Sequence, residues 1–309
     1  MGWKIVHLTT PCKIKVKSFN LLLLFYKTQE EKILVIKDIN FILFDNNQFS
    51  ITAQAIELLA SQNIATLFID KSFHPSAILL PYYRHSTITE IAHHQISISS
   101  EFRDKIWQEI IKAKIYNQSK VLEFFNIDKF QNLLNLRDRV ALYDTYNHEA
   151  QSARVYWGVI FDKFKRDNDR DDIINSMLNY IYAIVRALIA RNVSASGMLP
   201  IFGIWHNNRY NSFNLVDDLI EVFRPICDMF VKILYHQKYS NYHILDINIK
   251  RDLVSSLIYN SITINNIDTT LPKAIDIFVS SFKKSMIKSD TSIMVYPYIN
   301  QKFFRDEWI

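Results

Sequence analysis

The segment 203–225 holds the densest group of side chains suited to binding a metal ion or a phosphate. His206 lies in a loop-like stretch rich in asparagine, and Asp217, Asp218 and Glu221 follow it. Helix residues three or four apart share a face, so we expect Asp217 or Asp218 to approach Glu221. Like charges this close repel unless a cation or an arginine lies between them. Acids placed near an imidazole would hold magnesium or a divalent transition metal.

A purely structural interpretation of this segment is also open. In that interpretation Asn214 caps a helix and Asp217 stabilises its first turn. Glu221 then only pairs with Arg224, and His206 only packs. The first turn and the preceding loop hold more polar side chains than the start of a core-packing helix requires. This excess favours the metal-binding interpretation.

A further acid, Glu149, lies in the segment 147–157, where Ala150 and Ala153 allow close helix packing. A carboxylate near a helix start is favoured by the helix dipole, so its local sequence makes Glu149 an ordinary first-turn acid. His148 adjoins it, but consecutive helix residues point about 100° apart, so the two do not easily face one ion.

Two hydrophobic patterns divide the chain into the elements that would position these residues. Residues 3–81 carry short β-type runs, and apolar and charged residues alternate over 13–17. One helix is predicted at 51–61, with Ser50 as its N-cap. Downstream, apolar residues recur every three or four positions, which predicts helices at 100–124, 148–166, 171–193, 214–237, 249–260 and 269–286.

These patterns predict an α+β protein with a β-rich N-terminal domain and a larger, all-helical domain. We place the first domain at 1–84, a linker at 85–98 and the helical domain at 99–309, with the turn-like segment 81–84 before the linker.

The composition excludes several classes of protein. Only four glycines occur, and no two are close enough for a dinucleotide fingerprint or a P-loop. Two cysteines cannot build a Cys-rich zinc site, and they fit a reducing, cytoplasmic location. The longest apolar cluster, at 21–26, is far shorter than the roughly 20 residues of a membrane-spanning helix. The net charge of +5 is a weak indication of a polyanionic partner.

Several segments together resemble the CRISPR-associated adaptation endonucleases, the spacer-integrating proteins of CRISPR systems, in a form like that of type II systems. The resemblance covers roughly residues 1–235 and is loose over the last 70. The segments that carry it, in the family's order, are 1–6, 51–81, 149–154, 179–182, 203–206 and 213–225.

The resemblance implies a β-sandwich-like N-terminal domain for dimerisation or assembly, followed by a helical catalytic domain. It also implies that Glu149, His206 and Glu221 are catalytic and hold Mg²⁺ or Mn²⁺. Asp218 is expected to line the same metal site. Asp217 is adjacent to Asp218, and only the Asp-x-x-Glu spacing favours Asp218 over Asp217 as the additional acid of the site.

Three arginines, Arg154, Arg209 and Arg224, are candidates for contacting DNA phosphates, and pairing with neighbouring acids is an equal alternative for each. Gly203, three residues before His206, is expected to let the chain turn closely beside the metal-binding loop.

The implied reaction inserts prespacer DNA into a CRISPR array, by attack of its 3′-hydroxyl ends on phosphodiesters of the repeat. The implied partners are prespacer and repeat DNA, a second copy of the chain, a small companion protein whose dimer bridges two such homodimers, and the type II effector nuclease with an accessory adaptation protein. Two alternatives stay open: a catalytically silent DNA-binding or assembly subunit, and a structure-selective nuclease outside CRISPR.

Overall fold

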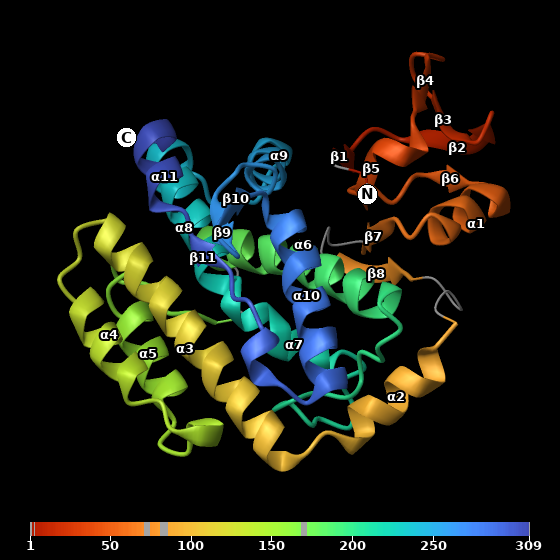
Figure 1. Cartoon of the computed structure of the whole chain (residues 1–309). Helices are drawn as coiled ribbons and strands as arrows, with labels where there is room; N and C mark the ends of the chain where they lie inside the picture. Colours follow the sequence, from red (N-terminus) through yellow and green to blue (C-terminus); the bar gives the residue numbers. More distant parts are fainter. Residues whose placement is uncertain (1, 3, 71–74, 81–85, 168–171, 309) are drawn as a thin grey trace.

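The computed structural model describes residues 2, 4–70, 75–80, 86–167 and 172–308. A strand-rich N-terminal part is followed by a helical part, which confirms the predicted α+β fold class (Figure 1).

Two four-stranded sheets make up the N-terminal part. One has the order β4-β3-β2-β6 and the other, which is mostly parallel, has the order β1-β5-β7-β8. The predicted alternation appears in β2, where Ile14 is buried and Lys15 is exposed. The strands are β1 (Lys4–Leu8), β2 (Cys12–Lys17), β3 (Asn20–Phe25), β4 (Glu31–Leu34), β5 (Ile39–Phe44), β6 (Ser50–Ile51), β7 (Ala65–Ile69) and β8 (Pro75–Leu79).

Strand β5 joins two hydrophobic cores because every one of its residues is buried. Ile42 and Phe44 belong to the core shared with α1 (Ala53–Ser61) and the first sheet. Phe41 and Leu43 belong to the larger core of the helical part. Since side chains alternate along a strand, the second sheet is covered on both faces.

The helical part contains ten helices among the residues described, and the long helix α3 lies beside α4 and α5 (Figure 1). This part also contains a small sheet of order β10-β9-β11, so it is not all-helical as predicted. The helices are α2 (Ile88–Ser97), α3 (Ser100–Phe124), α4 (Phe130–Asp138), α5 (His148–Trp157), α6 (Ile173–Ala195), α7 (Asn214–Leu219), α8 (Arg224–Leu234), α9 (Ile247–Ser256), α10 (Leu271–Lys288) and α11 (Gln301–Trp308), and the strands are β9 (Ile262–Ile264), β10 (Ile267–Thr269) and β11 (Tyr298–Ile299).

Most predicted helices begin or end at other residues in the structure, and three of these differences bear on the site or on capping. The helix at 51–61 begins at Ala53, because Thr52 rather than Ser50 accepts the capping hydrogen bond. The helix at 148–166 ends at Trp157. The helix at 214–237 is interrupted by a 3₁₀ turn at Ile220–Val222, where Pro225 lacks the N–H that an unbroken helix would use.

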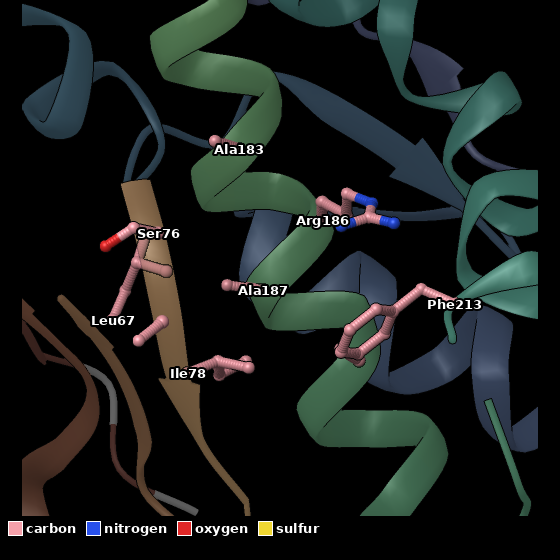
Figure 2. A pocket seen from close by; sticks show the side chains of 9 residues that line it. Leu67, Ser76, Ile78, Ala183, Arg186, Ala187 and Phe213 are labelled. Atoms are coloured by element: carbon pink, nitrogen blue, oxygen red, sulfur yellow. The ribbon is translucent and has the colours of Figure 1, made fainter. Parts of the chain in front are cut away.

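The predicted domain boundary and the turn-like segment 81–84 lie outside the described residues. Helix α2 occupies most of the predicted linker 85–98, and α6 packs directly on β7 and β8. Leu67 and Ile78 of the sheet and Ala187 of α6 line a small pocket of about 130 Å³ between these elements (Figure 2). The division of the chain into domains at 84–98 therefore stays a prediction.

Helix α6 is long and apolar enough to cross a membrane by length and composition, contrary to the expectation based on the cluster at 21–26. Of its most apolar window, 78% is buried inside the protein. A central helix packed on all sides needs apolar residues around its whole circumference, and α6 is such a core helix.

A buried polar network ties the second sheet to the helices. Asp45, at the end of β5, lies 2.8 Å from Lys250 Nζ of α9 and 2.7 Å from His7 Nε2 of β1, and Tyr180 of α6 donates a hydrogen bond to it. Burial alone would raise the pKa of Asp45, but His7 and Lys250 outweigh it and lower that pKa.

We expect Lys250→Met to destabilise the protein by about 3–5 kcal/mol, because it leaves the Asp45 carboxylate buried without its ammonium partner. Lys238→Met is the matched control, since Lys238 pairs with Asp252 in an exposed position and such pairs contribute about 0–1 kcal/mol. Urea unfolding of both variants measures the difference. Equal stability of the two would show that the network does not hold the sheet to the helices.

Candidate metal centre

Asp218 fixes the loop that carries His206. Its carboxylate is fully buried and accepts hydrogen bonds from the backbone N–H groups of Ile204 (2.5 Å), Trp205 (3.1 Å) and His206 (3.0 Å). The same carboxylate lies 2.6 Å from Nδ1 of the His206 ring. Both oxygens of Asp218 are thus directed at the loop, and Nε2 is the ring nitrogen left for a ligand.

Aromatic packing holds the same loop against α3. The ring of Trp205 stacks on Trp107 of α3 with centroids 5.2 Å apart and planes nearly parallel. Tyr143 covers Trp205 at 4.3 Å, and Trp107 also meets the His206 ring edge-on at 6.2 Å. The imidazole is therefore positioned by packing as well as by hydrogen bonds.

The expectation for Gly203 is confirmed by the close approach of the chain at this residue. A Cβ atom added there would lie 2.2 Å from the carbonyl oxygen of His206 and 2.8 Å from Asp218 Oδ2. Contacts this short exclude any side chain at Gly203 unless the loop shifts.

Glu149 is positioned by the start of α5. The buried Asp144 accepts hydrogen bonds from the backbone N–H groups of His148 (2.8 Å) and Glu149 (2.9 Å), and Asn147, in a left-handed conformation, caps the helix through Ala150. These contacts satisfy the first N–H groups of the helix and direct the Glu149 side chain toward α3.

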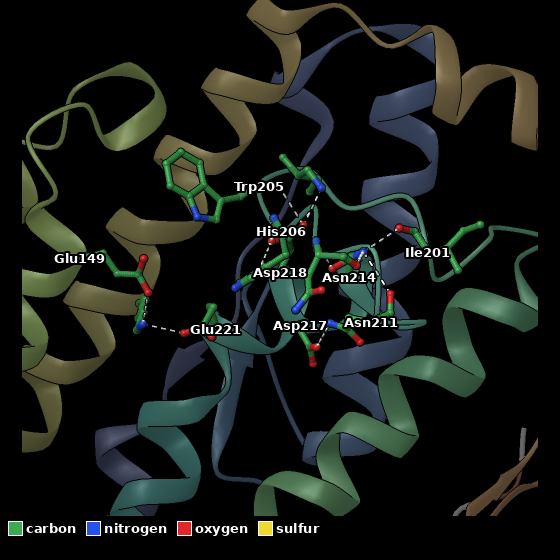
Figure 3. A network of polar contacts seen from close by, with 12 residues as sticks. Glu149, Ile201, Trp205, His206, Asn211, Asn214, Asp217, Asp218 and Glu221 are labelled. Carbon is green, nitrogen blue, oxygen red and sulfur yellow. Dashed lines mark hydrogen bonds and ion pairs between the residues drawn. The ribbon is translucent and has the colours of Figure 1, made fainter. Parts of the chain in front are cut away.

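Glu149 and Glu221 point toward each other and meet at one cation (Figure 3). Nζ of Lys114, on α3, lies 2.6 Å from Glu149 Oε1 and 2.6 Å from Glu221 Oε2. Arg224 Nε donates to the other oxygen of Glu221 at 2.8 Å. The two acids come from elements far apart in sequence, and the fold brings them to a single ammonium group.

The charges of this cluster stabilise one another. Burial would raise the pKa of Glu221, but Arg224 and Lys114 outweigh it and lower that pKa to about 2. Burial opposes the charge on Lys114 as well, yet Glu221 and Glu149 raise its pKa above the ordinary value. Glu221 is therefore a carboxylate and Lys114 an ammonium at neutral pH.

A cleft of about 450 Å³ opens beside this cluster. His206 and Glu221 line it together, with Asp217 at one side. Its other lining residues include Arg166, Arg224 and three side chains of α6, which are Asn179, Tyr182 and Arg186. The cleft is thus a predominantly basic space next to the two acids.

The three acids of the 217–221 segment take different partners instead of converging on one face. Asp217 binds Arg186, with Nε 2.6 Å from Oδ1, and accepts a hydrogen bond from Asn211. Asp218 turns to the His206 loop, and Glu221 turns to Lys114. The break after Leu219 contributes to this, because the 3₁₀ turn changes the angular spacing of the side chains.

The residues around these acids also differ from expectation in part. Asn214 does not cap α7, since its amide donates to backbone carbonyls of the preceding loop. Arg224 pairs with Glu221 and stacks on the Tyr182 ring at 4.7 Å, which is the structural alternative considered for it. Arg154 and Arg209 are exposed.

Sequence reasoning missed Lys114, Arg166 and Arg186. Lys114 stands within the buried stripe of α3, next to Ala113 and Ile115, and a lysine at such a position is a signal for a buried acid partner. Arg166 lies at the end of the helix predicted at 148–166, but in the structure it follows the end of α5 and donates to Asn175 and Asn179 of α6. The sequence held no comparable signal for Arg166 or Arg186.

The donor atoms suit a divalent cation although the described residues do not form a finished metal site. Among them, no group of three His, Cys, Asp or Glu side chains is arranged to hold a metal ion. Two carboxylates nevertheless meet at one cationic atom, since Glu149 Oε1 and the buried Glu221 Oε2 each lie 2.6 Å from Lys114 Nζ. Carboxylate oxygens with one imidazole nitrogen match the ligand preference of Mg²⁺ or Mn²⁺.

A family model described as CRISPR associated protein Cas1 matches residues 6–243. The chain belongs to the Cas1 family. The match ends at residue 243, a few residues beyond the segment 1–235 over which the sequence carries the resemblance. All four residues of the predicted site, Glu149, His206, Asp218 and Glu221, lie within the part that matches Cas1.

Similar proteins extend over almost the whole chain. The CRISPR-associated endonuclease Cas1 of Neisseria meningitidis serogroup C (strain 8013) is 32% identical over 301 residues, which cover 97% of each protein. A solved structure of a casposase bound to integration product has a TM-score of 0.77 at 21% identity and covers 93% of this chain and 92% of that one. A chain of a Cas6-RT-Cas1–Cas2 complex has a TM-score of 0.73 at 15% identity and covers 94% of this chain and 36% of that one. The two solved structures share the Cas1 fold described above.

Proposed function

We propose that this Cas1 protein is a metal-dependent DNA endonuclease and integrase of CRISPR adaptation, which inserts prespacer DNA into the repeat array. The observation that carries the proposal is the convergence of Glu149 and Glu221 on one cation position, beside His206 and a basic cleft. The N. meningitidis relative is named an endonuclease, and the casposase similar in fold was solved with an integration product.

Glu149, Glu221 and Nε2 of His206 would hold the Mg²⁺ or Mn²⁺ ion. A bound divalent cation supplies stabilisation of the charge that develops on a phosphodiester under attack by a 3′-hydroxyl. We assign Asp218 a positioning role in place of the predicted ligand role, because its two oxygens are already directed at four N–H groups of the His206 loop. Such a carboxylate behind a ligand histidine fixes the ring nitrogen that faces the metal.

The arginines of the cleft would bind the DNA backbone. Arg166 and Arg186 are each anchored by side chains of the protein, Arg166 by Asn175 and Asn179 and Arg186 by Asp217. A guanidinium group has five N–H donors, so an anchored arginine can still donate to a phosphate. The exposed Arg154 and Arg209 are further candidates for phosphate contacts outside the cleft.

Assembly with other chains belongs to the same proposal. The structure of a Cas6-RT-Cas1–Cas2 complex supports a Cas2 companion, whose dimer would bridge two homodimers of this chain. The strand-rich N-terminal part would serve dimerisation, and the type II effector nuclease with its accessory protein would deliver the prespacer. We place this assembly in the cytoplasm, where the two free, buried cysteines stay reduced.

Strand transfer on a branched DNA substrate in manganese tests the proposal. We expect the purified chain to cleave the branch and rejoin the flanking strands, and with its Cas2 companion to insert a prespacer into a plasmid that carries the repeat. A chain that binds duplex DNA but neither cuts nor joins it in manganese or magnesium, even with the companion, would instead be a DNA-binding or assembly subunit.

The metal-free protein should show a raised pKa at His206. The hydrogen bond from Nδ1 to Asp218 stabilises the imidazolium, burial opposes it, and the charges of Asp218, Glu221 and Asp217 favour it. The imidazolium therefore persists above the ordinary pKa of 6.5, and its contribution to stability is lost as the pH rises through the folded-state pKa. A histidine NMR titration in EDTA, with His206→Gln to assign the signal, measures it. A His206 signal that titrates at or below 6.5 would contradict this charge environment.

A further inference from the structure

We propose that Lys114 is a resident counterion that occupies the cation position between Glu149 and Glu221 in the metal-free protein and competes with the divalent cation for it. This inference rests on the proposed metal site and concerns a residue that the site assignment does not include. In this account Lys114 sets how tightly the metal binds and keeps the two acids together until it arrives.

Two carboxylates account for the burial of Lys114 in the described part of the chain. Its side chain is only 10% exposed and lies in the buried stripe of α3, where an apolar residue would pack without a desolvation cost. The ammonium instead contacts one oxygen from α5 and one from the 3₁₀ turn at Ile220–Val222, each at 2.6 Å. A buried lysine with two carboxylate partners joins three elements at a single point.

Geometry prevents the ammonium and the metal from sharing this position unchanged. Two oxygens that each lie 2.6 Å from Nζ are no farther apart than twice that distance. A metal bonded to the same oxygens at about 2.1 Å would lie within about 5 Å of Nζ, where two cations in a buried site repel strongly. We therefore expect Lys114 to withdraw when the metal binds, and its flexible four-carbon stem allows that movement.

The charge balance favours the same exchange. Glu149 and Glu221 carry two negative charges, and Lys114 and Arg224 carry two positive ones, so the metal-free cluster is neutral. A divalent cation added with Lys114 in place would leave two uncompensated positive charges in a largely buried site. Withdrawal of Lys114 removes one of them, and the phosphates of bound DNA would neutralise the rest.

Lys114→Met tests the inference through metal binding and stability rather than through activity. We expect the variant to bind Mn²⁺ roughly ten- to a hundredfold more tightly than the unmodified chain, as measured by calorimetry. In EDTA it should unfold at a lower temperature, because the two carboxylates repel without a cation, and saturating Mn²⁺ should raise its Tm by more than it raises that of the unmodified chain. Lys112→Met is the control, since Lys112 lies on the same helix and pairs with Glu109 in a half-exposed position.

Two results separate this inference from the proposed function. Mn²⁺ affinity that depends on Glu149 but is equal or weaker in Lys114→Met would overturn the counterion role and leave the metal site intact. Mn²⁺ affinity that is indifferent to Glu149→Gln and Glu221→Gln would overturn the metal site itself. If Lys114→Met does not fold in EDTA, Lys114→Gln, which keeps a hydrogen-bond donor but no charge, gives the same comparison.

Discussion

Glu149→Gln is expected to reduce metal-dependent strand transfer by about 10²–10³-fold or more, the range for losing one group that stabilises developing charge. The amide keeps the size of the side chain but removes its charge, so the divalent cation loses a ligand. Glu149 is the cleanest acid to change, because its side chain is 28% exposed, whereas that of Glu221 is 8% exposed and pairs with both Lys114 and Arg224. Single-turnover rates on branched DNA in manganese measure the loss.

Glu109→Gln is the matched control for this experiment. Glu109 lies on α3, pairs with Lys112, and is half-exposed outside the cluster. We expect it to retain the rate of the unmodified chain and the same DNA affinity. If Glu149→Gln folds, binds DNA and joins strands at the rate of this control, Glu149 has no role in the reaction.

Asp218→Asn should weaken metal binding and strand transfer by about 10–100-fold, the usual cost of losing a carboxylate that orients a metal-binding histidine. The asparagine has one oxygen to accept hydrogen bonds, and its NH2 group would face backbone N–H groups of the loop that also donate. We therefore expect the free energy of unfolding to fall by about 1–3 kcal/mol. Manganese affinity and urea unfolding measure the two effects separately.

Asp217→Asn decides between the neighbouring acids. Asp217 pairs with Arg186 and Asn211, whereas the backbone N–H groups of residues 204–206 donate to Asp218. We expect its replacement to weaken DNA binding slightly, through Arg186, and to leave manganese affinity unchanged. The reverse pattern, with metal affinity lost in Asp217→Asn and kept in Asp218→Asn, would contradict this assignment. The positioning role would then belong to Asp217 and not to Asp218.

Periodicity in the sequence predicted the order of strands and helices because each pattern is local. Alternation over 13–17 and the three-and-four spacing in α3 follow directly from which face of an element is buried. Interruptions of helices were not predictable in the same way. The break at Ile220–Val222 depends on Pro225 and on the partners that Asp218 and Glu221 find in the folded chain.

The acids of the proposed site were predicted from the family resemblance, but their partners in the folded chain were not. Glu149 and Lys114 are 35 residues apart, and Lys114 and Glu221 are farther still, so only the packing of α3 against α5 and the 3₁₀ turn brings them together. Asp218 illustrates the same limit. Its spacing to Glu221 predicted a shared metal face, whereas the close turn at Gly203 places the backbone N–H groups of the loop against its carboxylate.

Anomalous X-ray diffraction from crystals soaked in manganese tests the metal site most directly. We predict one peak within bonding distance, about 2.0–2.3 Å, of Glu149, Glu221 and Nε2 of His206, with Lys114 moved away from both carboxylates. A peak at another place, or a fully soaked crystal in which Lys114 still bridges Glu149 and Glu221 and no manganese lies beside them, would contradict the account.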